Sequence, residues 1–155
     1  MRIGLGIDVH AFADGRRLVL AGVEVTHTRG LAGHSDADVL LHAIIDALLG
    51  AAGLGDIGWM FPPSDPQWRD AESLGLLASA YARVRAVGLS VVNVDATVIA
   101  EAPRLAPYIE AMRAAIAGAL ELDVTLVSVK ATTTDGLGFT GRGDGIAALA
   151  VVLLE

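Results

Sequence analysis

The sequence predicts an α/β fold, an α+β sandwich in which one mixed, mainly four-stranded sheet carries about three helices on one face. Short apolar segments with alternating or β-branched patterns recur along the chain, and longer segments with helical periodicity separate them. A small N-terminal hairpin of two short strands is expected over residues 17–25. No linker, repeat or low-complexity segment interrupts the 155 residues, so residues 1–155 are expected to form one domain.

The first strand is predicted over residues 2–10, where apolar residues alternate with polar residues and glycines. Asp8 and His10 lie two residues apart, so both side chains leave the same face of that strand. Such a pair is either solvated at the strand end or part of a ligand-binding site, and both interpretations stay open at this point. Gly4 and Gly6 share that face and are expected to leave the approach to the two side chains open.

Residues 39–52 are apolar almost throughout, which predicts a nearly buried helix. Its polar exceptions, Asp38, His42 and Asp46, are spaced four residues apart and therefore share one face. Ser35 is expected to cap the N-terminus, with Asp38 in the acidic position of a capping box. Because an unpaired buried charge is costly, these three side chains must either form hydrogen bonds in the core or take part in a site where His42 binds a metal ion. In the second case, Asp38 or Asp46 is expected to orient the His42 ring.

The rest of the chain completes the predicted fold. Residues 56–66 are rich in Gly and Pro, which predicts an irregular loop that serves either as a connector or for ligand contacts. A polar loop interrupted by glycines spans residues 132–145. Further strands are expected at residues 89–100, 124–132 and 146–154, and further helices from Asp70 or Ser73 to about Val87 and from about Pro107 to Leu122.

Composition and charge narrow the class of function. Hydrophobic residues make up 54% of the chain and charged residues 19%, a balance that favours an oligomer over a monomer with a tight Ala-rich core. The net charge of −7 argues against a nucleic-acid partner, and the absence of cysteine excludes disulfides and thiolate metal sites. The sequence shows neither a signal core nor an apolar run of bilayer length, so a cytoplasmic protein without membrane association is expected.

Several motifs together carry a resemblance to a known family. They are Asp8-Val9-His10, His34-Ser35, His42, Asp56-Ile57-Gly58, Thr132-Thr133-Thr134 and Gly138-Phe139-Thr140-Gly141-Arg142-Gly143. In this order and spacing, the set resembles the 2-C-methyl-D-erythritol 2,4-cyclodiphosphate synthase family of the non-mevalonate isoprenoid pathway. The resemblance extends over essentially the whole chain, so the family's fold and activity become expectations for it.

The resemblance implies two metal ions. The first, usually zinc, would be bound by Asp8, His10 and His42. Two imidazoles and a carboxylate leave one tetrahedral position open, with ligand distances of ~2.0–2.2 Å, and that position would receive a phosphate oxygen of the substrate. The second ion, magnesium or manganese, would lie at the substrate diphosphate beside Asp135, where the family more often has Glu. The shorter side chain leaves both direct and water-mediated contact open.

The resemblance also implies the reaction. The substrate would be 4-diphosphocytidyl-2-C-methyl-D-erythritol 2-phosphate, whose 2-phosphate attacks the β-phosphorus and expels CMP, the work of a phosphorus–oxygen lyase. No protein nucleophile is needed, so the enzyme has to align two anions and neutralise their charge. His34 and Thr133 are implied as stabilisers of the transition state, with Ser35 beside His34 at the same substrate.

The implied substrate pocket draws on two parts of the chain. The methylerythritol and ribose part comprises Asp8, Val9, His10, His34, Ser35, Asp56, Ile57, Gly58, Phe61, Pro62, Pro63, Ser64 and Asp65. The cytidine and diphosphate part comprises Ala100, Glu101, Ala102, Pro103, Arg104, Leu105, Ala106, Thr132, Thr133, Thr134 and Asp135. Two residues depart from the family pattern: Pro63 stands where an acidic residue is usual, and Arg104 offers a cation for phosphate in a segment that more often carries Lys.

The resemblance further implies a homotrimer with an active site between each pair of neighbouring subunits. Phe139 and Arg142 would lie at an apolar central cavity that accepts an isoprenyl diphosphate, although Arg142 could instead form a salt bridge between subunits. Two other functions remain open on the residues alone. One is a metal-dependent phosphohydrolase that uses the same ligands to activate water, and the other is a non-catalytic trimer that binds prenyl diphosphates.

Overall fold

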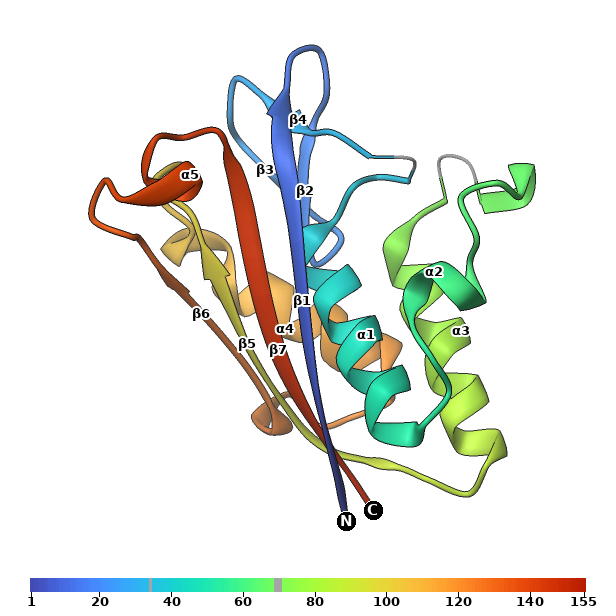
Figure 1. Ribbon diagram of the computed structural model, residues 1–155. Helices are drawn as coiled ribbons and strands as arrows, with labels where there is room; N and C mark the ends of the chain where they lie inside the picture. Colours follow the sequence, from blue (N-terminus) through green and yellow to red (C-terminus); the bar gives the residue numbers. More distant parts are fainter. Residues whose placement is uncertain (34, 69–70) are drawn as a thin grey trace.

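The computed structural model describes residues 1–33, 35–68 and 71–155, and it confirms the expected α/β sandwich. A five-stranded sheet forms one layer, and a separate two-stranded sheet lies beside it. Helices α1 and α4 cover one face of the large sheet, and α3 packs against α1 on the same side (Figure 1). The two ends of the chain meet at one end of the sheet, where Arg2 pairs with Leu154.

The large sheet has the strand order β4-β1-β7-β5-β6. Its strands are β1 (Arg2–Ala13), β4 (Gly30–Leu31), β5 (Val91–Ile99), β6 (Val127–Thr132) and β7 (Gly145–Leu154). Strands β5 and β6 pair in parallel, and the other neighbouring strands of this sheet pair antiparallel. Four long strands were expected, and β4 adds a pair of residues at the edge. The expected N-terminal hairpin is formed by β2 (Leu18–Leu20) and β3 (Val23–Val25).

The three main helices are α1 (Val39–Ala52), α3 (Ser73–Ala86) and α4 (Ile109–Ala119). The short helices α2 (Ile57–Met60) and α5 (Gly138–Gly141) lie where irregular loops were expected, and 3-10 turns occur at Pro66–Trp68, Ala106–Tyr108 and Val124–Leu126. The strand expected over residues 124–132 therefore begins only at Val127, after a 3-10 turn. The loop prediction for residues 56–66 is therefore wrong in part. The Asp56 side chain accepts the Trp59 N–H at 2.8 Å, and this N-terminal cap stabilises a single helical turn in a Gly- and Pro-rich segment.

The start of α1 corrects the capping prediction. Asp38, and not Ser35, is the N-cap residue, and its carboxylate accepts the Leu41 N–H at 3.1 Å. Ala37 has a left-handed backbone (φ 56°), so the chain turns immediately before Asp38 and leaves Ser35 outside the helix. Ser35 Oγ instead accepts the N–H of Ala37 at 3.2 Å, in a local turn.

Helix α1 lies directly on β1, and the glycines of β1 allow the contact. A Cβ on Gly4 would lie 1.9 Å from the Ala47 carbonyl oxygen, and one on Gly6 would lie 1.9 Å from the Ala43 oxygen. The expectation that these glycines keep a ligand path open is wrong, because the helix backbone occupies that space. Most of α1 is fully buried, as its apolar sequence predicts.

The other face of β1 is uncovered and apolar. We call Ile3, Leu5, Ile7 and Val9 the outer face of β1; their exposed fractions are 73%, 61%, 54% and 47%. A row of large exposed aliphatic side chains on one strand is typical of a contact surface. None of the helices in the described part of the chain is long and apolar enough to cross a membrane.

Candidate metal centre and substrate pocket

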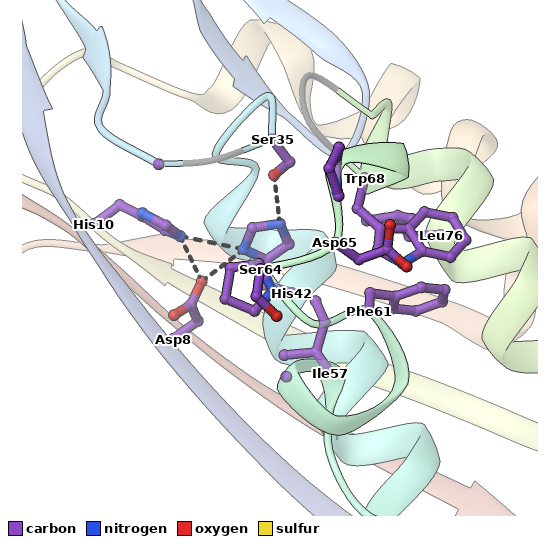
Figure 2. A pocket seen from close by; sticks show the side chains of 14 residues that line it. Asp8, His10, Ser35, His42, Ile57, Phe61, Ser64, Asp65, Trp68 and Leu76 are labelled. Carbon is purple, nitrogen blue, oxygen red and sulfur yellow. Dashed lines mark hydrogen bonds and ion pairs between the residues drawn. The ribbon is translucent and has the colours of Figure 1, made fainter.

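Three side chains from two elements meet beside α1. Asp8 and His10 project from the same face of β1, and His42 projects from the first turn of α1 toward them (Figure 2). Asp8 Oδ2 lies 2.9 Å from His10 Nε2 and 3.0 Å from His42 Nδ1, and the two ring nitrogens are 3.1 Å apart. Ligands of a tetrahedral zinc ion stand ~3.4 Å from one another. Each member of the metal triad (Asp8, His10 and His42) therefore offers one donor atom, and the spacing of the three atoms can hold a divalent ion.

Electrostatics favour an ionised Asp8. Burial alone would raise the pKa of Asp8, but hydrogen bonds and charge attraction from His10 and His42 outweigh it and hold the pKa well below its ordinary value. Burial likewise lowers the pKa of His10, whereas the Asp8 carboxylate raises it, and the net shift is upward. The site thus places a carboxylate beside an imidazole that holds its proton more strongly than usual.

Metal affinity should consequently fall as the pH falls. An incoming ion has to displace the proton that the raised pKa keeps on His10, so the Kd for zinc should increase by about tenfold per pH unit below that pKa and level off above it. Calorimetric titration between about pH 5.5 and about pH 8, in buffers of different protonation enthalpy, measures both Kd and proton release. A Kd that stays constant over this range, with no proton released, would contradict the expectation.

Hydrogen bonds behind the two rings set their orientation. His10 Nδ1 contacts the carbonyl oxygen of Ala32, so it carries the proton and leaves Nε2 free to face Asp8. His42 Nε2 lies 3.1 Å from Ser73 Oγ and 3.2 Å from Ser35 Oγ. Figure 2 shows the contact with Ser35 on the side of the ring opposite the triad. Each imidazole thus turns one nitrogen toward the common point and the other toward a neighbouring oxygen.

The structure corrects the expected roles of Asp38 and Asp46, neither of which hydrogen-bonds to His42 within the described residues. The Asp38 carboxylate accepts the backbone N–H groups of Ala21 at 2.9 Å, Gly22 at 2.7 Å and Leu41 at 3.1 Å. Complete burial raises the pKa of Asp38 to about 6, against the lowering effect of these donors. Asp46 accepts the N–H of Ile57 at 2.8 Å. Helical spacing fixed their common face, but nearby backbone donors determine where the carboxylates point.

A cavity of about 360 Å³ opens beside the metal triad. Its lining comprises Asp8, His10, Gly33, Ser35, His42, Ile57, Gly58, Phe61, Pro63, Ser64, Asp65, Pro66, Trp68 and Leu76. Most of the residues expected on the methylerythritol side are therefore gathered here. Phe61 and Trp68 meet edge to face, with ring centroids 5.0 Å apart, and form an apolar wall opposite the triad (Figure 2).

Several expected residues of this group do not line the cavity. Val9 belongs to the outer face of β1, Asp56 caps α2, and Pro62 is absent from the lining. The expected transition-state stabiliser His34 lies outside the described residues. The sequence analysis missed Gly33, Pro66, Trp68 and Leu76; a bulky aromatic residue in a Pro-rich segment was the signal that could have identified Trp68.

Arg16 is a further residue that the sequence analysis missed. Its guanidinium donates to the carbonyl oxygens of Gly33 at 2.9 Å and of Ser35 at 2.7 Å. These contacts tie the segment before β2 to Gly33 and Ser35, both of which line the cavity.

The residues expected to bind cytidine and diphosphate form a second group, away from this cavity. None of the segments 100–106 and 132–135 lines it, and neither do Phe139 and Arg142. Segments 100–106 and 132–135 lie where the parallel strands β5 and β6 end. Glu101 joins these two segments, because its carboxylate accepts the N–H groups of Thr134 at 3.0 Å and Gly136 at 3.2 Å.

Within the second group, the expected ligands are exposed. The Thr133 hydroxyl donates to Asp135 Oδ1 at 3.3 Å, and both residues are open to solvent. Arg142 forms an ion pair with Asp144 of the same chain at 3.0 Å. One chain therefore presents two separate sets of expected substrate contacts rather than one closed pocket.

Fold and site together define a class of protein: a single-domain α/β protein in which an Asp/His/His group that could hold a metal ion lies beside a cavity. The YgbB family model matches residues 1–155, and the chain belongs to that family. It is 63% identical to the 2-C-methyl-D-erythritol 2,4-cyclodiphosphate synthase of Moorella thermoacetica over 154 aligned residues. The alignment covers 99% of this chain and 94% of that protein. The resemblance found in the sequence is thereby confirmed.

Solved structures agree. The bifunctional IspDF of Campylobacter jejuni matches with a TM-score of 0.95 and 48% identity, over 99% of this chain and 42% of that longer chain. A 2C-methyl-D-erythritol-2,4-cyclodiphosphate synthase in a CDP-bound form matches with a TM-score of 0.91 and 36% identity, over 99% of this chain and 100% of that one.

Proposed function

We propose that this chain uses its metal triad to cyclise 4-diphosphocytidyl-2-C-methyl-D-erythritol 2-phosphate to the 2,4-cyclic diphosphate, with release of CMP. Family membership makes the chain a CMP-releasing, cyclising lyase of isoprenoid biosynthesis. The observation that carries the residue-level proposal is the convergence of Asp8 Oδ2, His10 Nε2 and His42 Nδ1 beside the cavity. A cytoplasmic location remains part of the proposal.

Zinc is the proposed ion at the metal triad, because two imidazoles and one carboxylate suit it and leave a position for substrate. When bound there, it would supply a Lewis acid for a phosphate oxygen. A second ion, magnesium or manganese, is proposed at the diphosphate near Asp135, whose exposed carboxylate offers the oxygen donor that such ions prefer.

The chain's own residues would position the reacting groups. Ser35 Oγ already accepts the N–H of Ala37, so its hydroxyl proton is available to a substrate phosphate. Phe61 and Trp68 would exclude water from the methylerythritol side. The 2-phosphate oxygen forms a bond to the β-phosphorus while the bond to CMP breaks, and CMP leaves with that electron pair. His34 and Thr133 are proposed to stabilise the charge that develops.

A homotrimer is proposed because one chain carries two separate half-sites. The cavity beside the metal triad lacks the cytidine and diphosphate segments, and a neighbouring subunit could supply them. The apolar outer face of β1 supports close contact between copies. Phe139 and Arg142 would then face a shared central cavity that accepts an isoprenyl diphosphate.

Product analysis distinguishes the candidate functions. Zinc- and magnesium-loaded protein, incubated with the CDP-linked substrate, should give the cyclic diphosphate and CMP in equal amounts, as measured by phosphorus NMR. Release of inorganic phosphate from simple phosphate esters would instead indicate a phosphohydrolase. Binding of prenyl diphosphates without any turnover would indicate a non-catalytic module.

A further inference from the structure

Behind the metal triad, the outer nitrogen of His42 meets the first residue of α3. His42 Nε2 lies 3.1 Å from the hydroxyl of Ser73, whose side chain is completely buried. The Ser73 hydroxyl in turn donates to Asp36 Oδ1, and the Ser73 N–H donates to Asp36 Oδ2 at 2.9 Å. A continuous hydrogen-bonded chain thus runs from Asp36 through Ser73 to the ring of His42.

The protons in this series of hydrogen bonds can point in only one direction. A carboxylate has no proton to donate, so the Ser73 hydroxyl turns its proton toward Asp36 and presents a lone pair to His42. His42 Nε2 must therefore carry the ring proton and donate it to Ser73. The hydrogen bond between Nδ1 and Asp8 Oδ2, which are 3.0 Å apart, is then the one that a bound ion would replace.

We propose that Ser73 and Asp36 are positioning residues that hold His42 as the Nε2–H tautomer, with Nδ1 free to bind the ion. The proposal rests on the proposed metal-binding role of the triad. It links the start of α3 to the metal centre, because Ser73 is the first residue of that helix and is tied to Asp36 through both its backbone and its side chain. Partners of this kind fix the ring and increase the basicity of the ligating nitrogen.

Isosteric substitution tests the direction of the hydrogen bonds from His42 through Ser73 to Asp36. Asp36→Asn keeps the shape but leaves one acceptor oxygen where two received donors, so either the Ser73 N–H or the Ser73 hydroxyl loses its acceptor and the hold of Ser73 on His42 weakens. Chelator competition should then give a Kd for zinc raised roughly 10- to 100-fold. Ser73→Ala should raise it by about tenfold, because Ser35 Oγ remains within 3.2 Å of Nε2 as a second acceptor. Ser79→Ala is the matched control: this serine lies on the same helix, and its hydroxyl donates to the Gly75 carbonyl at 2.8 Å, away from the metal triad.

A proton NMR readout separates positioning from general loss of structure. In the zinc form, the Nε2–H resonance of His42 should be protected from exchange in the unmodified protein and should shift and exchange faster in Ser73→Ala. This variant keeps the backbone contact with Asp36, so it carries the test even if Asp36→Asn does not fold. Zinc binding by the unmodified chain together with an unchanged Nε2–H signal and a Kd within about twofold in the variants would overturn the proposal. Failure of the unmodified chain to bind zinc would overturn the proposed function itself.

Discussion

Replacing His42 with Ala is expected to remove the bound ion and to lower the rate of CMP formation by about 10³-fold or more. A metal ion contributes several kcal/mol to the stabilisation of charge in a transition state, and about 1.4 kcal/mol corresponds to a tenfold change in rate. Without the imidazole, Asp8 and His10 retain only two of the three donors that converge in the site. Elemental analysis of the purified protein should find about one zinc per chain before the substitution and close to none after it.

His27→Ala provides the matched control for this experiment. Its ring packs against Phe12 at a tilt of 49°, with a centroid distance of 5.2 Å, and does not line the cavity, so metal content and turnover should be unchanged. Thermal unfolding of the metal-free proteins shows whether His42→Ala still folds. A folded His42→Ala variant that retains its zinc, or that keeps more than about a tenth of the turnover, would contradict the role of His42.

Replacing Gly6 with Ala is expected to cause a large loss of stability, although it adds only a single methyl group. The added Cβ would lie 1.9 Å from the Ala43 carbonyl oxygen and 2.6 Å from the Ala47 nitrogen, so the backbone of α1 would have to move away from β1. Overpacking of this kind usually costs about 1–3 kcal/mol, and contacts with backbone atoms place this site at about 3 kcal/mol or more. The melting temperature should fall by roughly 6–12 °C.

Gly50→Ala adds the same methyl group within α1 itself and is expected to have the opposite effect on stability. No atom lies within 4 Å of a Cβ at that position, so the helix should gain up to about 1 kcal/mol from the better helix former. The free energy of unfolding of both variants is measured by denaturant titration, at the same protein concentration and in the presence of a chelator. A Gly6→Ala protein within about 0.5 kcal/mol of the unmodified one would contradict the close contact of α1 with β1.

The general fold could be predicted because its main elements depend on local patterns. Alternation over residues 2–10 and the apolar run over residues 39–52 correspond to β1 and α1. Alternation gives the face of a side chain but not the distance to the next layer, and for this reason Gly4 and Gly6 were misinterpreted. The turn at Ala37, which moved the cap from Ser35 to the following Asp38, depends on a backbone angle that no spacing rule contains.

The candidate site was predictable to a smaller extent. The pattern of residues showed that Asp8 and His10 share a face, but the resemblance to a family was needed to add His42 from a distant element. Ser73 could not be found in the same way, because its contact with His42 arises only when α3 packs against α1. Long-range contacts of this kind leave no periodic signal in the sequence.

Anomalous diffraction at the zinc edge, from crystals of the zinc-loaded protein, is the most direct test of the metal centre. We expect one peak per chain at bonding distance, ~2.0–2.2 Å, from Asp8 Oδ2, His10 Nε2 and His42 Nδ1. A peak bound elsewhere on the chain, or a triad whose ring nitrogens turn away from an ion, would contradict the proposed metal centre.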